Sequence, residues 1–172
     1  RVLFRSHRHF RMAVHGSYAW SNNPLVYQEM NMEGDNRGWQ TGVIATGLIN
    51  KLAVSGGLSY IQLLRETRKI NFGFPFSQQA ITYNLSAGYL LFPFTYKGYE
   101  QLNVNLYCEF LGQKNTDLNT SFVDVAPAIQ FIIASKMRIN AGARFQINGN
   151  AHRMANEAIY VSMEYYLLNV FR

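Results

Sequence analysis

The stretch Phe10–Trp20, FRMAVHGSYAW, places mostly large apolar residues at even positions and small or polar residues at odd positions. Alternation with a period of two is typical of a β-strand whose two faces meet different surroundings, and a helix would not sort its residues in this way. The polar face holds mainly small residues rather than the Lys and Glu that soluble sheets present to water. Such a face fits a narrow, crowded interior.

Seven further segments repeat this alternation, at 39–49, 52–60, 81–91, 102–110, 123–133, 137–147 and 159–168. The sequence therefore predicts an all-β protein of eight strands. The charged side chains inside these segments, together with His15, fall on the polar face and leave the bulky apolar face uncharged. They are Arg11, His15, Glu109, Asp124, Arg138, Arg144 and Glu164.

Two architectures fit this division of residues. In a soluble, lipocalin-like barrel the apolar face points inward to a ligand, whereas in a transmembrane barrel it meets lipid and the polar face fills the lumen. Only 15% of the residues are charged and 15% are aromatic, which is less charge than soluble domains carry. Composition favours an eight-stranded antiparallel up-and-down transmembrane β-barrel.

The lengths of the connections favour the same architecture. The connections at 50–51, 93–98 and 135–136 are short, whereas those at 21–38, 65–79, 112–121 and 148–157 are longer and polar. Outer-membrane barrels combine short periplasmic turns with longer external loops. An even number of strands then places both termini on the periplasmic side. We expect one barrel domain over 10–172, preceded by a basic segment, 1–9, that is an extension or the start of the first strand, and by an export signal upstream.

Aromatic residues gather at both predicted rims, where amphipathic rings prefer the headgroup level of a membrane. Large aromatics also favour strands of any kind, so this alternative interpretation stays open. The predicted belts contain Trp20, Trp39 and Phe110 at the long-loop rim, and Phe10, Phe92, Tyr165 and Phe171 at the short-turn rim.

From Phe10 to Phe171 the pattern resembles the small eight-stranded outer-membrane barrels of Gram-negative bacteria. Phe171 is similar to the terminal aromatic residue that barrel assembly recognises in this class, although Arg172 follows it. The resemblance implies location in the outer membrane and contact with its lipids. Other envelope proteins in a complex are partners only under the leading functional hypothesis below.

Three arginines and three carboxylates face the predicted lumen, and unpaired buried charges are costly. We therefore expect a paired polar network that fills the barrel, with Arg144 beside Asp124 or Glu109 and Glu164 beside Arg11 or Arg138. An eight-stranded barrel is just wide enough for side chains to fill. A conducting pore is not expected.

No catalytic residue is predicted. His15–Gly16–Ser17 is similar to the His-x-Ser pairing of outer-membrane deacylases, but in that family the reactive face meets lipid. Here both residues fall on the lumen face, and residues two apart on a strand lie about 6–7 Å apart, too far for a direct hydrogen bond. Both are interpreted as filling residues.

Other functional classes find little support in the sequence. His7, His9 and His152 lack the neighbouring ligands of a metal site, no cofactor motif is present, and Cys108 is interpreted as a small apolar residue facing lipid. The net charge of +6 is spread along the short-turn rim without the pattern of a nucleic-acid-binding module.

Three functions remain as hypotheses. The leading one is a non-catalytic outer-membrane barrel with a filled lumen, acting through its wall or external loops as a structural or accessory subunit of an envelope assembly. The alternatives are a lipid A-modifying outer-membrane enzyme and a soluble lipocalin-like ligand-binding barrel.

Overall fold

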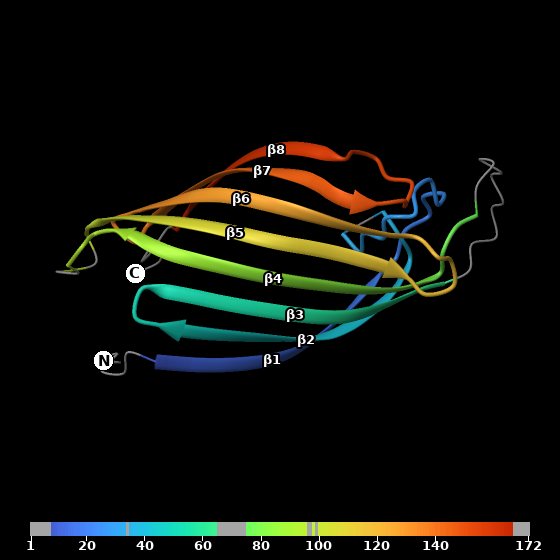
Figure 1. The fold of residues 1–172 in the computed structure, drawn as a ribbon, viewed down its shortest axis with the longest axis horizontal. Helices are drawn as coiled ribbons and strands as arrows, with labels where there is room; N and C mark the ends of the chain where they lie inside the picture. The colour runs from blue at the N-terminus through green and yellow to red at the C-terminus, as the bar shows by residue number, and fades with distance from the viewer. Residues whose placement is uncertain (1–7, 34, 65–74, 96–97, 99, 167–172) are drawn as a thin grey trace, which may run out of the picture.

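A computed structural model describes residues 8–33, 35–64, 75–95, 98 and 100–166 of the chain. These residues form a single eight-stranded sheet in which every strand is antiparallel to its neighbour in sequence (Figure 1). The expected all-β, up-and-down order of eight strands is confirmed. The strands are β1 (Arg8–Ala19), β2 (Gly38–Ile49), β3 (Leu52–Leu63), β4 (Gln79–Phe92), β5 (Leu102–Asn115), β6 (Ser121–Ile133), β7 (Met137–Gly149) and β8 (Glu157–Tyr165).

The sheet curls strongly, so that strands three apart approach each other across one face. The hydroxyl oxygens of Tyr107 on β5 and Tyr160 on β8 are 3.3 Å apart. We call the face that carries these hydroxyls the concave face and the opposite one the convex face. The residues predicted to be polar lie on the concave face, and the large apolar residues lie on the convex face.

The sheet is open between its first and last strands. Ladders of paired residues join each strand to the next from β1 to β8, but among the described residues none joins β8 back to β1. The described strands therefore do not show the closed ring that the sequence predicts, and β1 and β8 each have one edge without a paired strand among them. Both strands expose side chains on both faces along most of their length.

The short turns share one end of the sheet with the start of β1 and the end of β8 (Figure 1). Between β6 and β7, Ala134 and Ser135 have φ of 50° and 53°, and the amide of Lys136 donates to the carbonyl of Ile133 at 3.0 Å. These features define a type I′ turn, whose twist matches that of the strands. Asn50, with φ of 55°, begins the two-residue connection from β2 to β3.

Several strands run further than the sequence indicates, and β5 and β3 show why. β5 continues five residues past Phe110, so this residue does not end the strand, and the connection to β6 shrinks to 116–120. The reason is tertiary, because Gln113 and Asn115 are polar yet buried beneath the loop between β1 and β2. β3 likewise reaches Leu63, which packs in a small apolar cluster with Met30 of that loop.

Two predictions concern the ends of the chain. β1 begins at Arg8, so the end of the basic segment 1–9 belongs to the first strand, whereas residues 1–7 lie outside the described residues. Phe171, the proposed terminal aromatic, also lies outside them. No helix among the described residues is long and apolar enough to cross a membrane.

Candidate functional site

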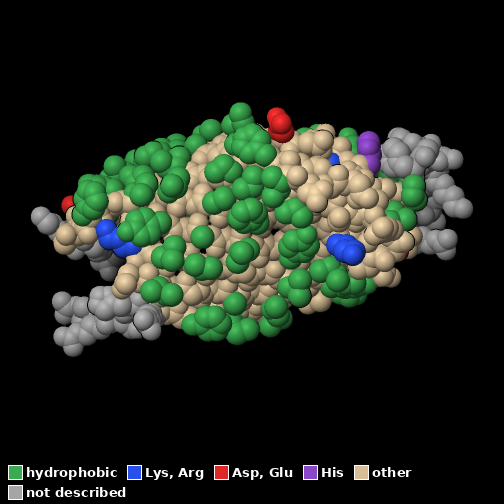
Figure 2. Space-filling model, viewed as in Figure 1, with side chains coloured by type: hydrophobic (Ala, Val, Ile, Leu, Met, Phe, Trp, Pro, Cys, Tyr) green, Lys and Arg blue, Asp and Glu red, His purple; other side chains and the backbone are tan. Residues whose placement is uncertain are grey.

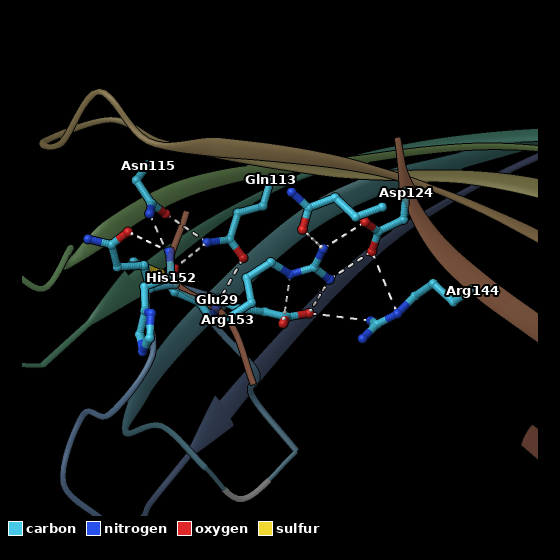
Figure 3. A network of polar contacts seen from close by, with 10 residues as sticks. Glu29, Gln113, Asn115, Asp124, Arg144, His152 and Arg153 are labelled. Carbon is cyan, nitrogen blue, oxygen red and sulfur yellow. Dashed lines mark hydrogen bonds and ion pairs between the residues drawn. The ribbon is translucent and has the colours of Figure 1, made fainter. Parts of the chain in front are cut away.

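The loop that joins β1 to β2, residues 20–37, folds over the concave face at the long-loop end and forms a cap. Gln113 of β5 fixes it, because its side chain accepts from the amide of Met30 at 3.0 Å and donates to the carbonyl of Gln28 at 2.8 Å. Asn115 donates to the same carbonyl at 3.2 Å. Two buried side chains of one strand thus hold the cap on the sheet (Figure 3).

The cap is also joined to the connection between β7 and β8, residues 150–156. The amide of Gln28 donates to the carbonyl of His152 at 2.8 Å, and the amide of His152 donates to the side chain of Gln28 at 2.9 Å. The ring of Tyr27 stacks on His152 with the centroids 5.8 Å apart. Segments more than a hundred residues apart in sequence therefore form one surface.

Arg153 lies at the centre of this surface, and its side chain is fully buried. Its two terminal nitrogens each donate to one oxygen of Asp124 at 2.7 Å, which is the bidentate geometry of a strong arginine–carboxylate pair. Two further N–H groups donate to Glu29 at 3.0 and 3.1 Å, and the last donates to Gln146 at 3.1 Å. All five guanidinium donors are thus used within the chain.

Arg144 completes the cluster from β7. Its guanidinium lies 3.3 Å from Glu29 and 3.6 Å from the buried carboxylate of Asp124. Two arginines and two carboxylates therefore balance in charge, as a buried ionic group requires. Figure 3 shows Glu29 of the cap between the two guanidinium groups.

The protonation of Arg153 follows from this geometry. Burial lowers the pKa of the guanidinium, but the hydrogen bonds to Asp124 and Glu29 outweigh that effect and hold the pKa above its ordinary value. Arg153 therefore stays charged and saturated with acceptors. This arrangement stabilises the cap and leaves no guanidinium donor for a substrate.

A second polar contact crosses β2 at a glycine. His15 of β1 and Ser59 of β3 flank Gly42 in one row of the sheet, and their side chains meet at 3.2 Å over it. A Cβ at Gly42 would contact the Ser59 hydroxyl and lie 2.7 Å from Nε2 of His15. The missing side chain is what lets residues two strands apart hydrogen-bond.

Replacing Gly42 with alanine is therefore expected to cost about 1–3 kcal/mol of unfolding free energy, because the extra methyl group overpacks this contact. Gly47→Ala is the matched control in the same strand, since a Cβ there meets its nearest atom at 4.0 Å. Urea titration of the folded protein measures both. Equal stability of the two variants would show that the row is not tightly packed.

A ladder of amides crosses the concave face nearer the short-turn end. Asn105 donates to Gln130 at 3.0 Å, Gln130 to Asn140 at 2.7 Å, and Asn140 to Ser162 at 3.0 Å. The ladder spans β5 to β8 and stops at the free edge of β8. The concave face is thus organised by polar contacts along most of its length.

The structure brings some predicted lumen residues together and leaves others apart. Asp124 and Arg144 meet in the capped cluster, and Arg138 and Glu164 form an exposed ion pair at 3.3 Å. Glu109 receives a long contact from Asn84 at 3.5 Å. Arg11 is exposed on the edge strand β1, and His15 pairs with Ser59 rather than Ser17.

The predicted aromatic residues lie at different levels along the strands. Trp20 directly follows β1 and lies 3.5 Å from the guanidinium of Arg37, and Trp39 is the second residue of β2. Phe110 lies inside β5 rather than at its end. Phe10, Phe92 and Tyr165 lie toward the short-turn end and are exposed.

Below the cap, the concave face forms an open pocket of about 350 Å³ that reaches from His15 past Ser59 and Asn84 to Arg144. Among the described residues, no group of three or more His, Cys, Asp or Glu side chains is arranged to hold a metal ion. His15 and Ser59 are the residues that most resemble a pair of general base and nucleophile, because their side chains are hydrogen-bonded to each other.

Sequence reasoning missed Glu29, Gln28 and Arg153, although they join the cap to the connection between β7 and β8. All three lie in connections, where a single charge or amide among polar residues carries no periodic signal. No family model, curated protein or solved structure matches this chain significantly.

Proposed function

We propose that this protein is a non-catalytic β-barrel of a bacterial outer membrane, with a side-chain-filled interior, that serves as a structural or accessory subunit of an envelope assembly. The observation that carries the proposal is the exposed apolar surface of the convex face. Figure 2 shows apolar side chains spread over the strands on this side of the molecule.

The exposed fractions on the convex face are high in the middle of the sheet as well as at its edges. They are 54% for Leu58, 56% for Leu85 and 50% for Leu106, and they rise to 79% for Val14 and 86% for Ile159. A contiguous apolar surface of this extent is rare on soluble monomers and marks contact with a membrane or a protein. Lipid is the surrounding that suits a whole sheet face.

The few charges on the convex side support the same interpretation. By strand alternation, Lys114 and Glu157 project to that side, and both lie at the long-loop ends of their strands. This placement suits an apolar band flanked by polar rims, as in transmembrane barrels.

We also propose that β1 and β8 pair with each other in the membrane and so close the barrel. Hydrocarbon contains no water to satisfy the free N–H and C=O groups of an edge strand, so spanning sheets close. Neither strand carries the Pro or Lys residues that commonly block free edges. Closure would also place the exposed Arg11 side chain inside the barrel.

The non-catalytic part of the proposal is supported by the capped cluster. Arg153 uses every donor within the chain, and the cap is fixed to β5 and to residues 150–156 by paired hydrogen bonds. Such a cap is a preformed surface for contacts with a neighbouring protein. An eight-stranded barrel is narrow, and the cap lies over the pocket of about 350 Å³ in its interior, which leaves little room for transport.

To test the proposed location in the membrane, the chain is expressed in a Gram-negative host with an export signal peptide attached. We expect the chain in the outer-membrane fraction, resistant to urea and carbonate washing, with a gel mobility that changes on heating. Recovery as a soluble periplasmic protein without detergent would refute the assignment. Purification in mild detergent then tests the accessory role, which predicts a constant co-purifying envelope protein and is refuted by consistent recovery of the chain alone.

The contact between His15 and Ser59 favours a second candidate, a lipid A-modifying enzyme, because a histidine can activate a serine at this distance. Mass analysis of lipid A from cells with the wild-type chain or Ser59→Ala distinguishes the candidates. The non-catalytic proposal expects identical lipid A, and a modification that depends on Ser59 would favour the enzyme.

A further inference from the structure

A groove of about 820 Å³ lies beside the cap, between residues 20–37 and the start of β8. The cap wall contributes Pro24, Val26, Glu33 and Asp35, and the opposite wall contributes Met154 and Ala158. Its size is within the range of ordinary ligand-binding sites. The hydrogen bonds that hold the cap are made within the chain, so the cap does not depend on a ligand in this groove.

The charge of the groove is opposite to that of the whole chain. Its lining contains Glu29, Glu33 and Asp35 against the single cation Arg144, whereas the chain has a net charge of +6. Arg144 is already committed to Glu29 and Asp124. The two exposed carboxylates, Glu33 and Asp35, therefore face the groove without an ion pair to a described side chain.

The remaining lining suits a peptide. Met154 is 79% exposed and offers a flexible thioether that adapts to apolar side chains, and Pro24 and Val26 extend this apolar wall. Acidic and apolar groups thus line the same groove.

We propose that this groove binds a basic, partly apolar peptide segment of a neighbouring envelope protein, whose Lys or Arg side chains pair with Glu33 and Asp35. The inference deepens the proposed accessory role and rests on it for the identity of the partner as an envelope protein. The charge of the groove indicates this occupant, because an acidic groove on a basic chain attracts cationic segments and repels acidic ones.

The test uses the full chain folded in detergent micelles and a random heptapeptide library displayed on phage. We expect selected peptides to carry two or more Lys or Arg residues beside apolar ones. A synthetic copy of the most enriched peptide is expected to bind Glu33→Gln/Asp35→Asn about 5–20-fold more weakly, as the loss of two partly exposed ion pairs implies. In Asp35→Asn the amide oxygen keeps the contact from Asn31, so the loop geometry is retained.

Two further variants separate the groove from general charge effects. Ala155→Trp fills the groove without changing charge and should weaken binding at least about tenfold, whereas Glu100→Gln, an exposed carboxylate at the short-turn end, should leave it unchanged. No enrichment of basic peptides, or equal binding by the groove variants and wild type, would overturn the inference. Peptide binding by a chain that fails to enter membranes would support the groove and refute only the proposed membrane role.

Discussion

Replacing Arg153 with methionine is expected to lower the free energy of unfolding by about 3–5 kcal/mol, because removing one partner of a buried ion pair leaves the other charge uncompensated. Asp124, fully buried, would retain only the longer contact to Arg144 at 3.6 Å. The cap would also lose both arginine contacts to Glu29. Urea titration in micelles, followed by tryptophan fluorescence, measures the change.

Arg138→Met is the matched control. Its ion pair with Glu164 is longer, 3.3 Å against 2.7 Å for Arg153 and Asp124, and both side chains are more than a third exposed, so the expected loss is at most about 1 kcal/mol. Arg153→Met/Asp124→Leu, which removes the whole pair, should recover much of the stability. Equal losses of unfolding free energy for Arg153→Met and Arg138→Met would show that the buried cluster contributes no more to stability than an exposed ion pair.

Leu85→Arg is expected to destabilise the protein in lipid bilayers by about 2–4 kcal/mol, the cost of an arginine at the bilayer midplane of a barrel. Leu85 lies in the middle of β4 on the convex face and is 56% exposed. On a water-exposed surface the same substitution would change stability by no more than about 0.5 kcal/mol. Reversible unfolding from phospholipid vesicles distinguishes the two surroundings.

Ile147→Arg provides the depth control. Ile147 is 58% exposed, like Leu85, but lies near the long-loop end of β7, where the penalty should fall to about 0–1 kcal/mol. A large loss at Leu85 with a small loss at Ile147 is the pattern of an apolar band with a defined thickness. Equal, small losses at both positions would contradict a membrane surrounding for the convex face.

The strands and their order could be predicted from the sequence because both follow from local sequence patterns. Residues 52–60 and 102–110 alternate cleanly, and tight connections such as Asn50–Lys51 make antiparallel neighbours unavoidable. The ends of the strands could not be predicted in this way. Gln113 and Asn115 look like loop residues, and only the cap that covers them makes them part of β5.

The candidate site was harder to predict for the same physical reason. Alternation identified Asp124 and Arg144 as concave residues, but their common partners, Glu29 and Arg153, come from connections without a repeating pattern. The contact of His15 with Ser59 depends on the strand register and on the missing side chain of Gly42. Register and loop paths are set by non-local contacts, which one sequence does not display.

The pairing of β1 with β8 is the central claim, and disulfide trapping in native membranes tests it most directly. In a Cys108→Ser background, Val14→Cys is combined in turn with Ile159→Cys, Val161→Cys and Met163→Cys, all on the convex face. A closed barrel predicts that oxidation traps at least one combination as a monomer with an internal disulfide. If no combination forms an internal disulfide, or if only disulfide-linked dimers appear, β1 and β8 of one chain are not neighbours and the closed barrel is wrong.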